Sequence, residues 1–205
     1  LRGVEAGVDW TPMRGAKVAA TLFANRLEGA IANVSLGRGP GVFPGVGFVA
    51  SGGVYRQRQN VEAIRTRGLE IDADWARGPW SAALSYALTD ARIEATDAAL
   101  ALDGKRPAQV ARHSASASLG WERGGVALDA TARFIGRQFE DDSNSRALPA
   151  ALTFDGSARF RISRRLALEA RAENIFDKKV IAALGGDGTR ERALPRTLWL
   201  GMRFR

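Results

Sequence analysis

The residues that could do chemistry are few in this chain, and their spacing matches no catalytic centre. The sequence has one histidine, His113, and no cysteine, which excludes thiolate zinc sites, cysteine nucleophiles and motifs that need two histidines. It has no Gly-x-Ser-x-Gly nucleophile motif. A lone histidine is more typical of a polar strand position than of a metal site. We therefore expect no enzyme activity, no cofactor and no bound metal.

Three polar segments look like binding loops but lack the residues that such loops need. Asp141 and Asp142 lie beside Ser143 and Asn144, without the spaced oxygen ligands and bend glycine of a calcium loop, so a solvated loop is predicted. The glycine-rich stretch 37–53 has no Gly-Lys-Ser/Thr ending and precedes no helix, which favours an outer loop over a phosphate cradle. Residues 185–188 indicate turn chemistry.

Two short segments combine aromatic rings with arginines and are the predicted ligand contacts. Tyr55, Arg56 and Arg58 lie within four residues of one another, and Arg137 with Phe139 repeats the pairing. A ring beside fixed positive charges suits an anionic chelate or an aromatic catecholate. The same arginines could instead bind phosphate groups of a lipid or make no contact at all.

The charge balance does not by itself identify a partner. The chain has 205 residues, a net charge of +8 and 30 basic residues, of which only four are lysine. Nucleic-acid binding would require the positive charge to gather on one face or stripe. The arginines are instead spread over turns, loops and polar strand positions and are mixed with acids, so we expect no nucleic-acid partner.

The dominant pattern in the sequence is alternation with a period of two. In residues 152–162 the even positions are apolar or small and every polar residue occupies an odd position, as a half-buried strand requires. The same alternation predicts nine strands of roughly 9–13 residues. They cover 4–10, 18–24, 65–75, 80–88, 110–122, 126–134, 152–162, 166–172 and 194–204. The polar face carries acids and arginines in mixed order, which predicts ion pairs across strands.

The connections between these strands alternate in length. Short turns are predicted near 11–15, 77–79, 123–125 and 163–165. Long loops are predicted over 37–63, 93–107, 141–150 and 177–193. Aromatic residues of the apolar face lie beside the short turns, namely Trp10, Trp75, Trp80, Trp121 and Phe204. Long strands, asymmetric loops and an aromatic girdle favour an all-β, antiparallel transmembrane barrel over a soluble β-sandwich or lipocalin-like barrel.

Four stretches resemble the C-terminal barrel of TonB-dependent outer-membrane receptors. They are NRLEGAIANV (Asn25–Val34), the Y…N…A…GxE segment Tyr55–Trp75, the loop-to-strand segment Leu102–Trp121, and ALEARAENIFDKKV (Ala167–Val180) followed by Glu191–Arg205. The third stretch lacks one proline of the family's pair. The last is the most specific, because Asn-Ile-Phe-Asp-Lys, a loop, Pro-Arg and an alternating strand resemble the family's closing hairpin. The residues that carry the family motifs are Gly68, Glu70, Asn174, Phe176, Asp177, Pro195, Arg196 and Phe204.

The resemblance implies that residues 1–205 are the C-terminal portion of a larger plugged barrel. At about 23 residues per strand, a barrel of about 22 strands needs near 500 residues before any plug. The plug, its TonB box and the first strands are therefore expected outside this sequence. Family members usually end in an aromatic residue, whereas Phe204 is followed by Arg205. We therefore expect either that the chain has been trimmed or that its natural end carries more residues.

The preferred functional hypothesis is energised uptake across the bacterial outer membrane. The resemblance implies TonB–ExbB–ExbD as the energy source and a small-molecule chelate as ligand, most often a ferric siderophore, less often cobalamin, haem, another metal complex or a sugar. Outer-membrane lipid and lipopolysaccharide would surround a monomeric barrel. A passive porin or structural barrel is the alternative, and a soluble β-rich binding protein is a third. Ligand identity is left open by the sequence.

Overall fold

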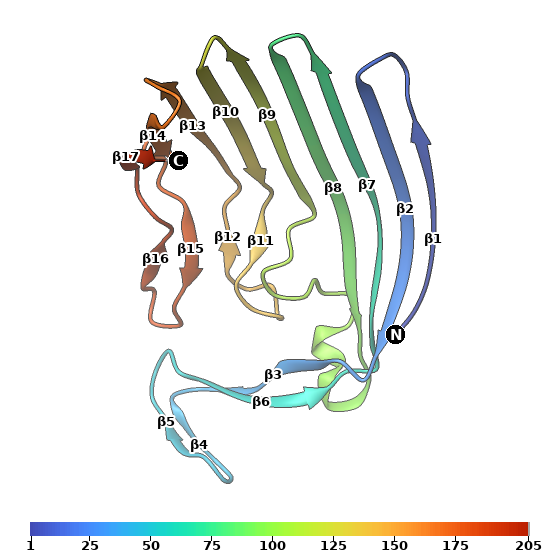
Figure 1. Ribbon diagram of the computed structural model, residues 1–205. Coiled ribbons are helices and arrows are strands. Elements are labelled where there is room, and N and C mark those ends of the chain that lie inside the picture. Colours follow the sequence, from blue (N-terminus) through green and yellow to red (C-terminus); the bar gives the residue numbers. More distant parts are fainter. Residues whose placement is uncertain (205) are drawn as a thin grey trace.

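The chain folds as one curved antiparallel sheet of nine strands with smaller sheets at one end (Figure 1). The computed structural model describes residues 1–204. In spatial order, which is also chain order, the nine strands are β1 (Arg2–Trp10), β2 (Ala16–Glu28), β7 (Ala63–Arg77), β8 (Trp80–Glu94), β9 (His113–Arg123), β10 (Val126–Ile135), β13 (Ala151–Arg161), β14 (Leu166–Glu173) and β17 (Thr197–Phe204). Each strand pairs with its sequence neighbours in the sheet, so the predicted nine-strand meander is confirmed.

The register places the predicted apolar positions on one continuous face. Leu69 lies opposite both Leu22 and Leu88, and farther along the sheet Phe160 lies opposite Leu168. The aromatic residues near the short turns share this face, where the rings of Trp80 and Trp121 lie directly opposite with centroids 6.5 Å apart. This face is outward in a membrane barrel, and the polar face is the lumen.

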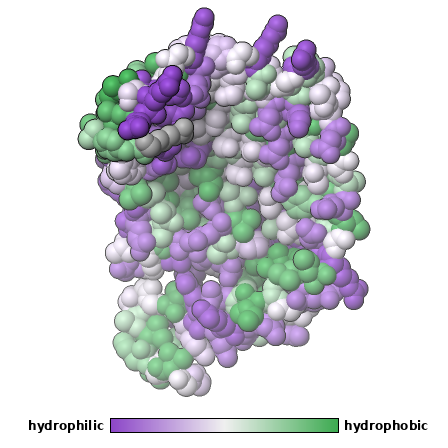
Figure 2. Space-filling view, in the orientation of Figure 1, coloured by the Kyte–Doolittle hydropathy of each residue, from purple (hydrophilic) through white to green (hydrophobic). Residues whose placement is uncertain are grey.

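Four tight turns join the strands at one end, and three of them contain glycine with a positive φ, including Gly15 between β1 and β2. Gly124 and Gly125 have φ angles of 61° and 86° between β9 and β10, a backbone region that other residues rarely adopt. Gly78 has φ 61° in the turn between β7 and β8. Figure 2 shows hydrophilic side chains standing out from this end of the molecule.

The long connections at the opposite end carry further structure. Four small two-stranded sheets and one helix form there: β3 (Ile31–Arg38) with β6 (Val54–Asn60), β4 (Gly41–Phe43) with β5 (Gly47–Val49), β11 (Gln138–Phe139) with β12 (Ala147–Leu148), β15 (Ile181–Leu184) with β16 (Arg190–Arg192), and the 3₁₀ helix η1 (Asp97–Leu102). The prediction that the first long loop begins at residue 37 was wrong, because β2 ends at Glu28 and the chain then leaves the main sheet. The stretch 37–53 is largely the β4–β5 hairpin.

The main apolar core lies at the base of the β3–β6 hairpin. Val34, Val61, Ile93 and Leu102 are each at most 2% exposed and cluster with four alanines and Ile64. Ile64 and Ile93 belong to the lumen face by register. The hairpin therefore packs on the inner side of the sheet and crosses its open end (Figure 1). Within residues 1–204 there is no helix of sufficient length and hydrophobicity to cross a membrane.

Candidate functional site

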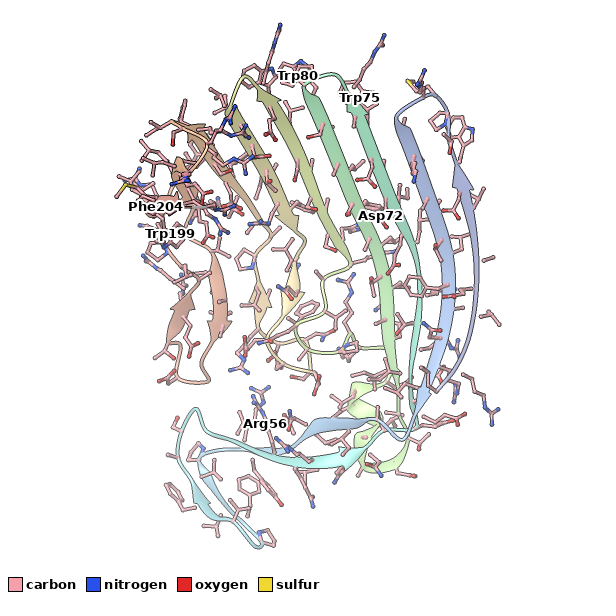
Figure 3. All side chains as sticks on the ribbon, viewed as in Figure 1. Arg56, Asp72, Trp75, Trp80, Trp199 and Phe204 are labelled. Carbon is pink, nitrogen blue, oxygen red and sulfur yellow. The ribbon has the colours of Figure 1, made fainter. Side chains whose placement is uncertain are left out.

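The β3–β6 hairpin presents Arg56 and Arg58 on one face at the open end of the sheet. The two arginines alternate along β6 and lie opposite Ser35 and Asn33 of β3. Both are exposed, and neither forms an ion pair with another residue of the described chain 1–204. Figure 3 shows Arg56 extending from β6 toward the main sheet. The pair thus offers two uncompensated positive charges to the space that the sheet encloses.

Tyr55 does not share the face of Arg56 and Arg58, although the three residues were predicted to act together. Successive side chains of a strand point to opposite faces. Tyr55 accordingly lies on the other face of β6, half-buried, with its ring centroid 5.8 Å from that of Phe43. Its position supports the β4–β5 hairpin, and the expected combination of one aromatic ring with two arginines on one face is absent.

Arg137 and Phe139 lie together but apart from Arg56 and Arg58. The guanidinium carbon of Arg137 is 5.2 Å from the Phe139 ring centroid, a cation–π contact. Both line a hollow of about 480 Å³ that also includes Arg92, Arg106 and His113. Arg92 and His113 belong to the outward face by register, and the hollow lies at the rim of the sheet, where β8, β9 and β10 give way to their loops. His113 lies 2.9 Å from the Tyr86 hydroxyl, as expected for a polar strand histidine.

The segment 140–146 fastens the loops to one another. Asp142 accepts hydrogen bonds from the backbone N–H of Asn33 at 3.0 Å and of Ala108 at 2.9 Å. Asn144 exchanges two hydrogen bonds with the backbone of Arg106. On the other side, the Leu184 backbone donates to Glu140 and accepts from Arg146. All four long loops are therefore joined through this one segment.

Asp141 stabilises the conformation of that segment. The prediction that Asp141 lies in a solvated loop was wrong. It is 7% exposed and accepts hydrogen bonds from the Ser143 and Ser145 hydroxyls and from the backbone N–H of Ser145 and Arg146. Burial alone would raise the pKa of this carboxyl, but these hydrogen bonds outweigh burial and lower the pKa to about 2. The order of the loop thus depends on the ionised carboxylate.

Acidification is expected to loosen this loop in the full-length receptor. Since the pKa of Asp141 is about 2 in the folded loop and 3.8 ordinarily, its stabilisation of about 2 kcal/mol is complete above pH 4 and lost as pH falls toward 2. Pepsin cleavage within 136–150, compared at pH 4 and pH 2, should accelerate in the native receptor. Asp141→Asn should be cleaved readily at both pH values, and equal pH profiles for the two proteins would contradict the assignment.

Charged residues of the lumen face pair across strands, as predicted. Arg133 of β10 pairs with Asp155 of β13, and Arg203 lies 3.0 Å from Glu169. Trp199, which is not among the predicted site residues, also lies on this face, with the Arg171 guanidinium carbon 5.6 Å from its ring centroid. The odd position of Trp199 among even apolar residues was the signal available. Charges that pair within the wall are less available to a ligand.

The resembled closing motif forms a compact turn between β14 and β15. Asn174 is 7% exposed, and its amide exchanges hydrogen bonds with the backbone of Lys178 at 2.8 and 2.9 Å. Asp177 accepts a hydrogen bond from the Arg196 N–H at 3.0 Å. Phe176 packs edge-on against Phe154 with centroids 5.3 Å apart. The motif therefore ties the last loop to the last strand and has a structural role.

Comparison with known proteins identifies the family. The model of the TonB-dependent receptor-like β-barrel matches residues 2–175, most of the chain. The chain belongs to the TonB-dependent receptor family. Proteins of this family are outer-membrane β-barrels, so the apolar face is the lipid face, the short turns are periplasmic and the long loops are extracellular. The barrel prediction is thereby confirmed over the soluble sandwich.

Individual TonB-dependent receptors resemble the chain at moderate identity. The ferrioxamine receptor of Yersinia enterocolitica is 31% identical over 129 residues, which are 58% of this chain and 18% of that protein. The vitamin B12 transporter of Photobacterium profundum is 26% identical over 123 residues, 60% of this chain and 19% of that protein. The ferric yersiniabactin uptake receptor of Yersinia pestis superimposes with a TM-score of 0.76 at 17% identity, over 98% of this chain and 29% of that structure. The chain thus spans about a fifth of the curated relatives, which are transport receptors rather than enzymes.

Proposed function

We propose that the receptor to which this chain belongs takes up an anionic ferric chelate, a siderophore, by TonB-dependent transport. The observation that carries the proposal is the β3–β6 hairpin across the extracellular mouth, with Arg56 and Arg58 exposed and without acidic partners among residues 1–204. Two guanidinium groups two residues apart on one strand face suit carboxylate or catecholate oxygens. The names of the ferrioxamine and yersiniabactin receptors support an iron chelate as the cargo class.

In this proposal the chain is wall and vestibule and makes or breaks no covalent bond. The plug and the remaining strands come from other parts of the receptor, and TonB–ExbB–ExbD supplies energy through the plug. The paired charges of the lumen face hold the wall and line the plug surface. The barrel works as a monomer in outer-membrane lipid. A passive barrel would give uptake that is equal in cells with and without TonB.

The test is the double substitution Arg56→Ala/Arg58→Ala in the full-length receptor. We expect binding of an anionic ferric chelate to weaken by roughly tenfold or more, because each lost charge-assisted hydrogen bond is strong. A neutral ferric hydroxamate should bind as before. Binding is measured by fluorescence quenching, and uptake with ⁵⁵Fe in cells with and without TonB.

A matched control removes the same number of positive charges, but from the periplasmic side of the barrel. Arg164→Ala/Arg165→Ala removes two arginines from the turn between β13 and β14. This turn lies at the opposite end of the sheet from the mouth. This control should bind the anionic chelate as the native receptor does. Unchanged affinity in the Arg56→Ala/Arg58→Ala receptor would retire these two residues as ligand contacts.

A further inference from the structure

The hairpin that carries Arg56 and Arg58 is held against the wall mainly by apolar contacts. Val34 of β3 is 1% exposed and packs with Ile93 and Leu102. Because side chains alternate along a strand, Val34 lies on the face of the hairpin opposite to the two arginines. Apolar contact is not directional. This core therefore keeps the hairpin in place without fixing the angle at which it crosses the mouth.

A single hydrogen bond supplies the direction that the apolar core lacks. The backbone N–H of Asn33 in β3 donates to Oδ2 of Asp142 at 3.0 Å. In the part of the chain that the structure describes, residues 1–204, no other hydrogen bond or ion pair joins residues 31–60 to the rest of the molecule. The strand β3 has β6 on one side only, and Asp142 lies at its open edge. The orientation of the hairpin thus depends on this one acceptor.

This hydrogen bond acts at the level of the arginines. Asn33 lies directly opposite Arg58 in the β3–β6 register, and Ser35 lies opposite Arg56. Cβ atoms of directly opposite residues are about 5 Å apart, so the backbone that Asp142 holds and the backbone that carries Arg58 move together. A hairpin freed at Asn33 would pivot about its base, and both guanidinium groups would shift with it.

Asp142 is itself held firmly by the neighbouring loops. Its Oδ1 accepts the backbone N–H of Ala108 at 2.9 Å, so each carboxylate oxygen has a donor of its own. The segment before Ala108 is held by Asn144, which exchanges hydrogen bonds with the backbone of Arg106 at 3.0 and 2.8 Å. Hydrogen bonds to an ionised carboxylate are about twice as strong as those between neutral groups. Asp142 therefore connects the hairpin to two loops that also hold each other.

The charge of Asp142 would by itself act against an anionic ligand, because an acid near the mouth repels an anion. Within residues 1–204 the Asp142 carboxylate forms no ion pair with Arg56 or Arg58, and its partners are the two backbone N–H groups. Removing the acid would tighten binding if charge alone mattered. It would weaken binding if Asp142 positions the arginines. The two roles therefore predict changes of opposite sign.

We infer that Asp142 is a positioning residue for the anion-binding face of the β3–β6 hairpin. By holding Asn33, it keeps Arg56 and Arg58 in the orientation in which both guanidinium groups reach one anionic ligand. Such preorganisation raises affinity, because the freedom of the hairpin is lost on folding and not on binding. The inference rests on the proposed cargo site and adds to it a residue that does not touch the cargo.

The test measures the affinity of an anionic ferric catecholate for the full-length receptor by fluorescence quenching. Asp142→Ala should weaken binding roughly tenfold, against the direction expected from the lost negative charge. Asp142→Asn loses the same charge but keeps one acceptor oxygen, so its affinity should lie between those of the native receptor and Asp142→Ala. A neutral ferric hydroxamate, which does not need the arginines, should bind all three receptors equally and shows that they are folded.

The matched control is Asp187→Ala, which removes an acid of the last long loop that accepts hydrogen bonds from Thr189 within its own turn. This control should bind the anionic chelate as the native receptor does. In the Arg56→Ala/Arg58→Ala background, Asp142→Ala should have no further effect, because a positioning residue acts only through the residues that it positions. Unchanged or tighter binding by Asp142→Ala overturns the inference, and so does an equal loss in both backgrounds.

A measurement without ligand separates this inference from the proposed cargo. Spin labels on Ser51→Cys, in the turn between β5 and β6, and on Ser163→Cys, in a periplasmic turn, report the position of the hairpin relative to the wall. The distance distribution should broaden in Asp142→Ala and stay narrow in Asp187→Ala. An unchanged distribution in Asp142→Ala overturns the inference whatever the cargo is. If the distribution broadens but Arg56→Ala/Arg58→Ala binds the anionic chelate as the native receptor does, the cargo proposal alone fails and Asp142 still orients the hairpin.

Discussion

Replacing Gly68 with alanine is expected to block folding of much of the receptor in the outer membrane. A Cβ atom at this position would lie 2.1 Å from the Leu88 carbonyl oxygen and 2.6 Å from the Phe23 ring. The carbonyl belongs to the neighbouring strand of the sheet and cannot rotate away. Overpacking of this kind costs about 3 kcal/mol, at the upper end of its usual range. Gly68 thus allows β2, β7 and β8 to approach beneath the Phe23 ring.

The experiment compares folded fractions by heat-modifiable gel mobility and midpoints of urea unfolding. Gly156→Ala is the matched control, since a Cβ atom at Gly156 of the interior strand β13 meets only the Ile175 Cδ1 atom at 3.3 Å and the Asp129 carbonyl oxygen at 3.4 Å, contacts that a small shift relieves. The control should fold as the native receptor does. A second substitution, Phe23→Ala combined with Gly68→Ala, should recover little, because the clash with Leu88 persists. Native folding of Gly68→Ala would show that the strands can separate there at low cost.

Replacing Asn174 with alanine is expected to open the last loop of the receptor without unfolding the barrel. The substitution removes both hydrogen bonds to the Lys178 backbone and places alanine at a φ of 50°, which alanine tolerates poorly. The Lys178 backbone groups left without partners, together with this strain, should lower the opening free energy of the loop by about 3 kcal/mol. Trypsin cleavage after Lys178 and Lys179 should then be roughly a hundredfold faster.

Asn174→Gly separates the two contributions to that effect. Glycine accepts a positive φ but makes no side-chain hydrogen bonds, so its cleavage rate should fall between those of the native receptor and Asn174→Ala. Lys179→Gln removes one cleavage site without touching the turn and controls for site loss. If Asn174→Ala were cleaved no faster than the native receptor, the turn would be held by Asp177 and Phe176 instead.

The nine membrane strands were predictable because one face of each strand must be apolar. A shift of one residue would move Leu69 and Trp75 into the lumen and Asp72 into lipid, so the alternation determines both strand and register. The closing turn at Asn174 was also predictable, through a resemblance to known sequences rather than through alternation. Pairing of Arg133 with Asp155 followed from the mixed charges of the polar face.

The loops were less predictable because their structure depends on contacts between segments distant in sequence. Nothing beside Asp142 in the chain indicates that it binds the backbone of Asn33, 109 residues away. The β3–β6 hairpin itself could have been found, since alternation in 54–60 places Arg56 and Arg58 opposite to Tyr55. Proximity in sequence alone does not place Tyr55 on the same face as the two arginines.

The fastening of four loops through residues 140–146 limits where this receptor can vary during evolution. A substitution at Asp141 or Asp142 would disturb several loops together. Substitutions that would prevent binding by phages or antibodies are therefore poorly tolerated at these positions. The tip of the β4–β5 hairpin is different, because Val42 and Phe48 are 77% and 70% exposed and the tip stands apart from the other loops (Figure 2). Insertions and new epitopes are tolerated best at such tips. Surface variation among strains should therefore gather at residues 41–49 while the arginines at the mouth stay in place.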